Sequence, residues 1–261
     1  MVAAARKAAR RLLRDFGEVE QLQVSIKGPS DFVSQADLAA EATLKAELAK
    51  GRPDHAFLLE EGGTHGPEGW KFRWIVDPLD GTTNFLHGIP HWAISIALER
   101  RLAKTTEIVA GVIFSPAQNE LFVAEKGVGA YLNDRRIRVS ARREMAEALF
   151  ATGIPYAALP TKRAFSATLE RIMPEVAGVR RFGSAALDLA WVAAGRYEGF
   201  WELGLNPWDI AAGILLVREA GGFVTDEKGG DPLASGNVVA ANPHLHGRLR
   251  EIVLAGLEAA A

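Results

Sequence analysis

The first half of the chain consists mainly of short apolar runs separated by turn residues. These runs predict strands at 56–59, 72–76, 91–100, 108–115, 120–125 and 129–133. The segment 91–100 (HWAISIALER) alternates regularly, with its large apolar residues on one face, so we predict a half-buried strand there. Because no helical pattern separates the later runs, the first half is expected to form an antiparallel sheet.

Helical periodicity replaces the strand pattern at two places in this half. Residues 37–49 (DLAAEATLKAELA) predict a helix that ends near Gly51. Residues 1–16 are rich in alanine and in basic side chains, which predicts an amphipathic surface helix. A basic helix of this kind also suits an RNA or membrane surface, which is the alternative interpretation.

Strand and helix patterns alternate in the second half, as in an α/β fold. The predicted strands cover 149–154, 197–202, 222–226 and 237–242, and the predicted helices cover about 161–172, 184–194, 207–220 and 243–257. The helix at 207–220 has the clearest limits, because Asn206 can cap it, Pro207 fits its first position and Gly221 follows it. We place a subdomain boundary in the arginine-rich stretch 135–147, giving an α+β subdomain (1–140) and an α/β subdomain (141–261).

Composition narrows the possible functions. Of the 261 residues, 48% are hydrophobic and 24% are charged, and the net charge of -2 gives the whole chain no preference for polyanions. The chain has no cysteine, which excludes disulfide scaffolds, thiolate metal sites and cysteine nucleophiles and agrees with a cytoplasmic location. No apolar run approaches the ~20 residues needed to span a bilayer, so no membrane association is expected.

Candidate chemistry is concentrated in the segment 74–85 (WIVDPLDGTTNF). A buried strand delivers Asp77 to its carboxyl end, and Asp80 follows three residues later, after a proline that favours a tight turn. This spacing lets the two carboxylates converge and leaves the carbonyl group of Leu79 free to point into the same space. A lone motif of this kind is more often a solvated turn, so its surroundings decide its meaning.

Those surroundings favour a metal site. Gly81 permits a close backbone approach, and the N–H groups of a helix that starts at Thr82 would face an anion. Glu60 ends the predicted strand 56–59, and Asp209 lies in the first turn of a helix, where the helix dipole favours an anion. If these acids meet in one pocket, they suit a divalent cation, above all magnesium, that is bridged to a phosphate.

Competing motifs fit less well. The DPLDGTT segment resembles the DxDGT motif of haloacid dehalogenase phosphatases, but that chemistry needs acids at i and i+2, whereas Asp77 and Asp80 are at i and i+3. No GxxxxGK[ST] segment is present. His87 and His91 are four residues apart, but a glycine and a proline between them prevent a shared helix face.

Long segments of the chain resemble the inositol monophosphatase family. Residues 74–85 resemble the family's first signature, and residues 206–222 (NPWDIAAGILLVREAGG) resemble its second. Segments 31–37 (DFVSQAD), 59–63 (LEEGG) and 180–202 are similar to further family motifs and stand in the family's order. The resemblance implies a layered αβαβα sandwich of the inositol monophosphatase/fructose-bisphosphatase type, with an N-terminal α+β half and a C-terminal α/β half.

The resemblance also implies magnesium-dependent hydrolysis of a phosphate monoester by direct attack of water. The implied ligands of the first magnesium are Glu60, Asp77 and the carbonyl group of Leu79. Asp77, Asp80 and Asp209 would hold the second ion, and Glu60 would help to hold a third, weaker one. Most of these ligands fall in residues 1–140.

Catalytic and substrate-binding roles follow from the same resemblance. Thr82, hydrogen-bonded to Asp37, would position and deprotonate the attacking water, and Glu60 joins them as a catalytic residue. The implied substrate contacts are Asp80, Gly81, Thr82, Ser184, Ala185, Glu202 and Asp209.

The motifs leave the substrate and the partners open. myo-Inositol 1-phosphate is the leading candidate, and fructose 1,6-bisphosphate, histidinol phosphate and adenosine 3′,5′-bisphosphate are alternatives. The segment 153–157 (GIPYA) differs from the loop of animal members, which affects the fit of the polyol. The resemblance implies lithium sensitivity and a homodimer, and Trp92, Phe114 and Phe122 could serve its interface, although core packing is their commoner use. The arginines at 6–14 and 135–143 support an alternative role as an RNA- or transcription-associated regulatory factor that keeps the fold.

Overall fold

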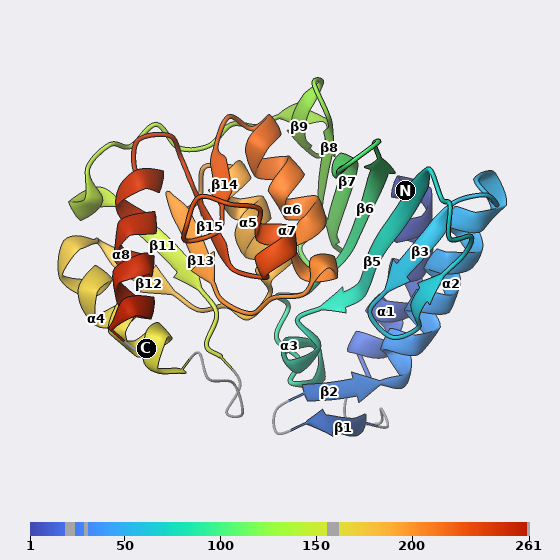
Figure 1. Cartoon of the computed structure of the whole chain (residues 1–261). Coiled ribbons are helices and arrows are strands. Elements are labelled where there is room, and N and C mark those ends of the chain that lie inside the picture. Colours follow the sequence, from blue (N-terminus) through green and yellow to red (C-terminus); the bar gives the residue numbers. More distant parts are fainter. Residues whose placement is uncertain (19–23, 29–30, 156–161, 260–261) are drawn as a thin grey trace.

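Two β-sheets alternate with three layers of helices (Figure 1). This computed structural model describes residues 1–18, 24–28, 31–155 and 162–259. Residues 156 and 157 of the segment GIPYA, and residue 161 at the start of a predicted helix, lie outside the described residues. Among the described residues, no helix is both long enough and apolar enough to cross a lipid bilayer.

The larger sheet belongs to the first half of the chain. Its strands, in spatial order, are β10 (Arg135–Arg136), β9 (Gly129–Leu132), β8 (Glu120–Glu125), β7 (Thr106–Ser115), β6 (Ala93–Arg101), β5 (Phe72–Asp80), β3 (Ala56–Leu59) and β4 (Gly63–His65). The strands from β5 to β10 pair antiparallel, as expected. The prediction was wrong for β3, which pairs parallel with β5. That exception brings the carboxyl ends of β3 and β5 to the same edge of the sheet.

The smaller sheet belongs to the second half. Its strands, in spatial order, are β12 (Gly178–Arg180), β11 (Leu149–Thr152), β13 (Gly199–Glu202), β15 (Val238–Ala241) and β14 (Phe223–Thr225). Strand β11 pairs parallel with both of its neighbours, whereas β15 pairs antiparallel with β13 and β14. A separate hairpin is formed by β1 (Val24–Gly28) and β2 (Asp31–Ser34).

The helices form an outer layer on each sheet and a shared middle layer (Figure 1). The outer pairs are α1 (Val2–Phe16) with α2 (Gln35–Gly51), and α4 (Lys162–Ile172) with α8 (His246–Glu258); the middle pair is α5 (Ala185–Ala193) with α6 (Pro207–Glu219). Two short helices, α3 (Thr82–Leu86) and α7 (Pro232–Ser235), and the 3-10 turns Met145–Glu147 and Met173–Glu175 complete the described elements. The layer order confirms the predicted αβαβα sandwich, while the 140/141 subdomain boundary stays a prediction.

The middle helices explain why strand β6 is more buried than predicted. Strand β6 was predicted to be half-buried, but both of its faces are buried from Ala93 to Ala97. One face packs under α1, and the other carries Ala93, Ser95 and Ala97 against α6, where the Ser95 hydroxyl donates to the Trp208 carbonyl at 3.2 Å. The small residues on this second face are therefore the contact surface of a helix layer.

The three aromatic side chains considered for a dimer interface are part of this interior. Trp92 and Phe122 are fully buried, and Phe114 retains 9% of its exposure. Their packing within one chain leaves Trp92 and Phe122 no surface, and Phe114 very little, for contact with a second copy.

Candidate active site

The end of strand β5 forms the floor of a pocket. The Asp77 Oδ1 atom accepts a hydrogen bond from the Leu79 N–H group at 2.9 Å, which fixes the predicted turn. Gly81 then adopts a left-handed φ of 92° as the N-cap of α3. A side chain at this position would meet the His91 carbonyl oxygen at 3.0 Å, so close approach also favours glycine.

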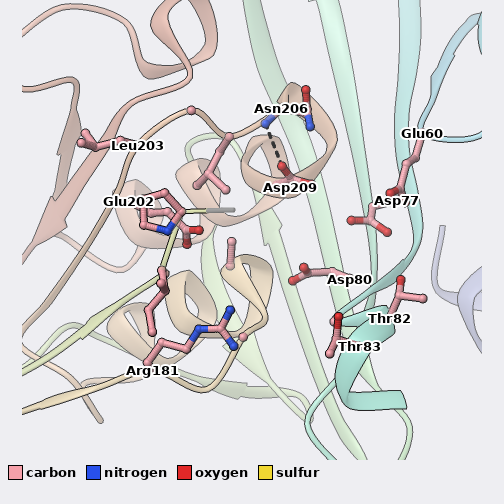
Figure 2. Close-up of a pocket in the computed structure, with 18 of the residues that line it drawn as sticks. Glu60, Asp77, Asp80, Thr82, Thr83, Arg181, Glu202, Leu203, Asn206 and Asp209 are labelled. Atoms are coloured by element: carbon pink, nitrogen blue, oxygen red, sulfur yellow. Dashed lines mark hydrogen bonds between the residues drawn. The ribbon is translucent and has the colours of Figure 1, made fainter. Parts of the chain in front are cut away.

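Strand β5, the turn after β3 and the first turn of α6 bring the four predicted carboxylate ligands to this pocket (Figure 2). Asp77 and Asp80 come from β5, and Glu60 follows β3, whose parallel pairing with β5 places it beside Asp77. The Glu41 carboxylate on α2 accepts the Glu61 N–H group at 2.8 Å and so supports the turn that carries Glu60. The parallel pair, which the sequence did not predict, is therefore what makes these acids converge.

Asp209 enters from the opposite side, in the first turn of α6. Its Oδ2 atom accepts the Asn206 N–H group at 2.7 Å, which closes the first turn of the helix (Figure 2). The predicted carboxylate ligands thus lie in one pocket together with Leu79, and the pocket has a volume of roughly 200 Å³.

The acids carry excess negative charge when no cation is present. Burial raises the pKa of Asp77 well above its usual range, and the charges of Glu60, Asp80 and Asp209 raise it further. Burial likewise raises the pKa of Asp209, with Asp80 as the next cause. Burial raises the pKa of Asp80 to about 6, although hydrogen bonds from Ser184 and the backbone oppose the shift.

This donor set fits a hard divalent cation. Carboxylate and carbonyl oxygens are the ligands that magnesium prefers, and a cation would relieve the repulsion that raises the pKa values. Among the described residues, no group of three or more histidine, aspartate or glutamate side chains is arranged so that it could already hold a metal ion.

Thr82 lies within hydrogen-bond distance of Asp37, the partner predicted for it. Its hydroxyl oxygen lies 3.3 Å from Asp37 Oδ2 and 2.9 Å from the Leu79 carbonyl oxygen. A hydroxyl has one proton, so it donates to one of these oxygens at a time and can accept a proton on its own oxygen. Asp37 is buried in the first turn of α2 and does not line the pocket itself.

The N-terminus of α5 binds one of the pocket acids. The Ser184 hydroxyl donates to Asp80 Oδ2 at 2.5 Å, and the Ala186 N–H group donates to the same oxygen at 2.7 Å. Ser184 is buried and does not line the pocket, whereas Ala185, Gly81 and Thr82 do. A direct substrate contact by Ser184 stays a prediction. What the structure shows is that Ser184 fixes the position of Asp80 through a hydrogen bond.

The wall opposite Asp77 contains Glu202, at the end of β13 (Figure 2). Burial and the charge of Asp80 raise the pKa of Glu202 to about 8, although Arg181 opposes the shift. Sequence reasoning missed Arg181 as a pocket residue, even though it lies within a segment that resembles a family motif.

Two further residues near Glu202 were also missed. Gly153 lines the pocket beside it. Asp188 is buried on α5, and its pKa is raised well above its usual range, first by burial and then by the charge of Glu202. A lone acid in the apolar helix AALDLAWVA was the available signal for Asp188.

Comparisons with known proteins agree with this geometry. The model of the inositol monophosphatase family matches residues 1–258. The inositol-1-monophosphatase of Rhizobium meliloti is 56% identical over 258 residues, which cover 97% of this chain and 94% of that protein. A Salmonella typhimurium protein named Nus factor SuhB is 45% identical over 245 residues, covering 94% and 90% of the two chains. The crystal structure of the extragenic suppressor protein suhB from Bartonella henselae superposes with a TM-score of 0.92 at 56% identity, covering 97% and 96%.

The fold, the acid-lined pocket and these matches place the chain among the phosphoric monoester hydrolases. It belongs to the inositol monophosphatase family.

Proposed function

We propose that this chain hydrolyses myo-inositol 1-phosphate to inositol and inorganic phosphate with magnesium as its cofactor. The observation that carries the proposal is the meeting of Glu60, Asp77, Asp80 and Asp209 in one pocket beside Thr82. The name of the Rhizobium meliloti relative supports inositol 1-phosphate as the substrate.

The acids divide into two sets that share Asp77. Glu60, Asp77 and the Leu79 carbonyl group would hold one magnesium, Asp77, Asp80 and Asp209 would hold the second, and Glu60 would help with a third, weaker ion. The four carboxylates of these two sets would balance the four positive charges of two ions, while Glu202, the fifth acid of the pocket, lies on the opposite wall. Bound magnesium would polarise the phosphoryl oxygens, increase the acidity of water and stabilise the leaving alkoxide.

The other pocket residues would bind and orient the reactants. The N–H groups of Gly81 and Thr82, where α3 begins, would donate to the phosphate oxygens. The Thr82 hydroxyl would accept a proton from the attacking water while Asp37 accepts the hydroxyl's own proton, since the two oxygens are 3.3 Å apart. Ala185 and Glu202 would contact the polyol on the opposite wall.

A phosphate-release panel tests the proposal directly. Purified protein is assayed with inositol 1-phosphate, fructose 1,6-bisphosphate, histidinol phosphate and adenosine 3′,5′-bisphosphate, with magnesium and with a chelator. We expect the highest kcat/KM on inositol 1-phosphate and no turnover with the chelator. A preference for another substrate would refute the assignment of the polyol, and turnover in the chelator would refute the metal dependence.

A second candidate is a regulatory role, which the name of the Salmonella typhimurium relative favours. Several arginines of α1 are exposed, but Arg11 and Arg14 bond the Asp15 carboxylate, which reduces the free charge. The test is salt-dependent binding of RNA by the purified protein, compared with a variant in which Arg6 and Arg10 are changed to glutamate. Equal binding by the two proteins would refute a role of this helix. A homodimer and a cytoplasmic location stay predictions of the same family assignment.

A further inference from the structure

Gly153 and Glu202 lie next to each other although 48 residues separate them along the chain. Gly153 follows β11, and Glu202 is the last residue of β13. The two strands pair in parallel, with Thr152 opposite Trp201, so the two chains leave the sheet side by side at the pocket. Both residues line that pocket.

The Glu202 carboxylate occupies the space that a side chain at position 153 would need. A Cβ atom placed on Gly153 would lie 1.8 Å from Oε1, 1.9 Å from Cδ and 2.2 Å from Oε2 of Glu202. Real Cβ contacts essentially never fall under 3.0 Å. Gly153 is not among the glycines with a positive φ, so the neighbouring carboxylate, and not the backbone conformation, requires glycine here.

We infer that Gly153 is a specificity-determining residue, whose missing side chain lets the Glu202 carboxylate lie against the pocket wall in the position that contacts the polyol. The inference rests on the proposed function. It adds a residue that acts on the substrate through Glu202 and makes no contact of its own with the reacting phosphate.

The shape of the site determines where a displaced carboxylate would go. Both residues line the pocket, and a methyl group at position 153 would occupy the place of the Glu202 carboxylate, which would have to move to another position in the cavity. The cavity also contains Asp80, whose negative charge acts on Glu202. The displaced group would therefore take up substrate volume and lose its proposed hydrogen bonds to the polyol hydroxyls.

The clash involves only the far end of a flexible side chain, so the fold should tolerate it. The variant Gly153→Ala should lower kcat/KM for inositol 1-phosphate by about ten- to a hundredfold, the range for loss of a charged hydrogen bond. The loss should be much smaller for p-nitrophenyl phosphate, which has no hydroxyl groups beside the phosphate. Gly247→Ala is the matched control, because Gly247 is exposed on α8 and a Cβ there meets nothing within 4 Å.

A double-mutant cycle isolates the mechanism. In a Glu202→Ala background the obstructing carboxylate is gone, so adding Gly153→Ala should change kcat/KM by less than about threefold. If Gly153→Ala lowers the melting temperature, the double variant should recover it. The inference would be overturned if Gly153→Ala lowered kcat/KM as much in the Glu202→Ala background as in the unmodified protein. It would also be overturned if the single variant Gly153→Ala had an unchanged kcat/KM on inositol 1-phosphate.

The same data separate the inference from the function on which it rests. If the unmodified protein fails to hydrolyse inositol 1-phosphate, the proposed function is wrong and the inference falls with it. If the unmodified protein is active and Gly153→Ala equals it, only the inference is overturned. A parallel loss on both substrates in Gly153→Ala also overturns it, because such a loss means that the metal and phosphate region has moved.

Discussion

Asp77 is the carboxylate that both proposed metal positions share, and the substitution Asp77→Asn tests it with little change in shape. Asparagine keeps the Oδ1 atom that accepts the Leu79 N–H group, so the turn at the end of β5 should persist. Its amide can also donate to Glu60, which shares a hydrogen bond with Asp77 in the unmodified protein. In the metal-bound protein, where Asp77 would be ionised, the change therefore removes one negative charge from the centre of the pocket and leaves its hydrogen bonds in place.

The expected effects have opposite signs on stability and on activity. Without metal, Asp77 is buried beside three other acids, so replacing it by a neutral amide relieves charge repulsion and should stabilise the metal-free protein. Each kcal/mol of this stabilisation should raise the melting temperature of the metal-free variant by roughly 2–4 °C. Metal assistance supplies several kcal/mol to the reaction, so losing ~4 kcal/mol would lower kcat about a thousandfold.

Thermal melting with and without magnesium, together with phosphate release, measures both effects. At a hundred times its Kd, magnesium should stabilise the unmodified protein by about 2.7 kcal/mol and the variant far less. Asp134→Asn, a change to an exposed acid, is the control and should alter neither quantity. Near-normal turnover of Asp77→Asn, or equal magnesium shifts in the two proteins, would refute the shared-ligand assignment.

Three further predictions concern inhibition, polyol recognition and pH. Lithium should inhibit uncompetitively at millimolar concentration, as the family resemblance implies, and steady-state kinetics that show no inhibition at tens of millimolar would contradict this. Glu202→Gln should lower kcat/KM for inositol 1-phosphate by about ten- to a hundredfold and affect p-nitrophenyl phosphate much less; equal losses would place Glu202 outside polyol recognition. The folded state raises the pKa of Asp188, so the folded protein holds this proton more tightly than the unfolded chain does. The free energy of unfolding should therefore fall as the pH rises above about 4, the pKa of Asp188 in the unfolded chain, by at most ~1.4 kcal/mol per pH unit. Asp188→Asn should weaken this fall in metal-free urea unfolding between pH 5 and pH 8, and identical pH slopes would contradict the reasoning.

Local sequence signals were sufficient for most elements and for the acids of the site. The helix α6 begins at Pro207, as its cap and proline predicted, because those signals act within one turn of the chain. Strand β8 covers the predicted residues 120–125, since alternating burial leaves a period of two in the sequence. Asp77, Asp80 and Asp209 were found in the same way, from strand ends and a helix start.

Features that depend on the neighbours of an element were not predictable in this way. The second buried face of β6 exists because α6 covers it, and α6 comes more than a hundred residues later in the sequence. The parallel pairing of β3 with β5 likewise leaves no mark in either strand, although it determines that Glu60 meets Asp77. The contact between Gly153 and Glu202 was not predictable for two reasons. It depends on the pairing of β11 with β13, and the only trace of it in the sequence is a glycine, which has no side chain.

Asp80 connects the metal side of the pocket to the substrate side. Its Oδ2 atom accepts both hydrogen bonds from the start of α5, from the Ser184 hydroxyl and the Ala186 N–H group. A carboxylate has two oxygens, so Asp80 can keep these donors and still offer Oδ1 to a cation. The first turn of α5 also contributes Ala185 to the pocket wall. We therefore expect a shift of Asp80 upon metal binding to move the start of α5 and, with it, the surface that we propose contacts the polyol.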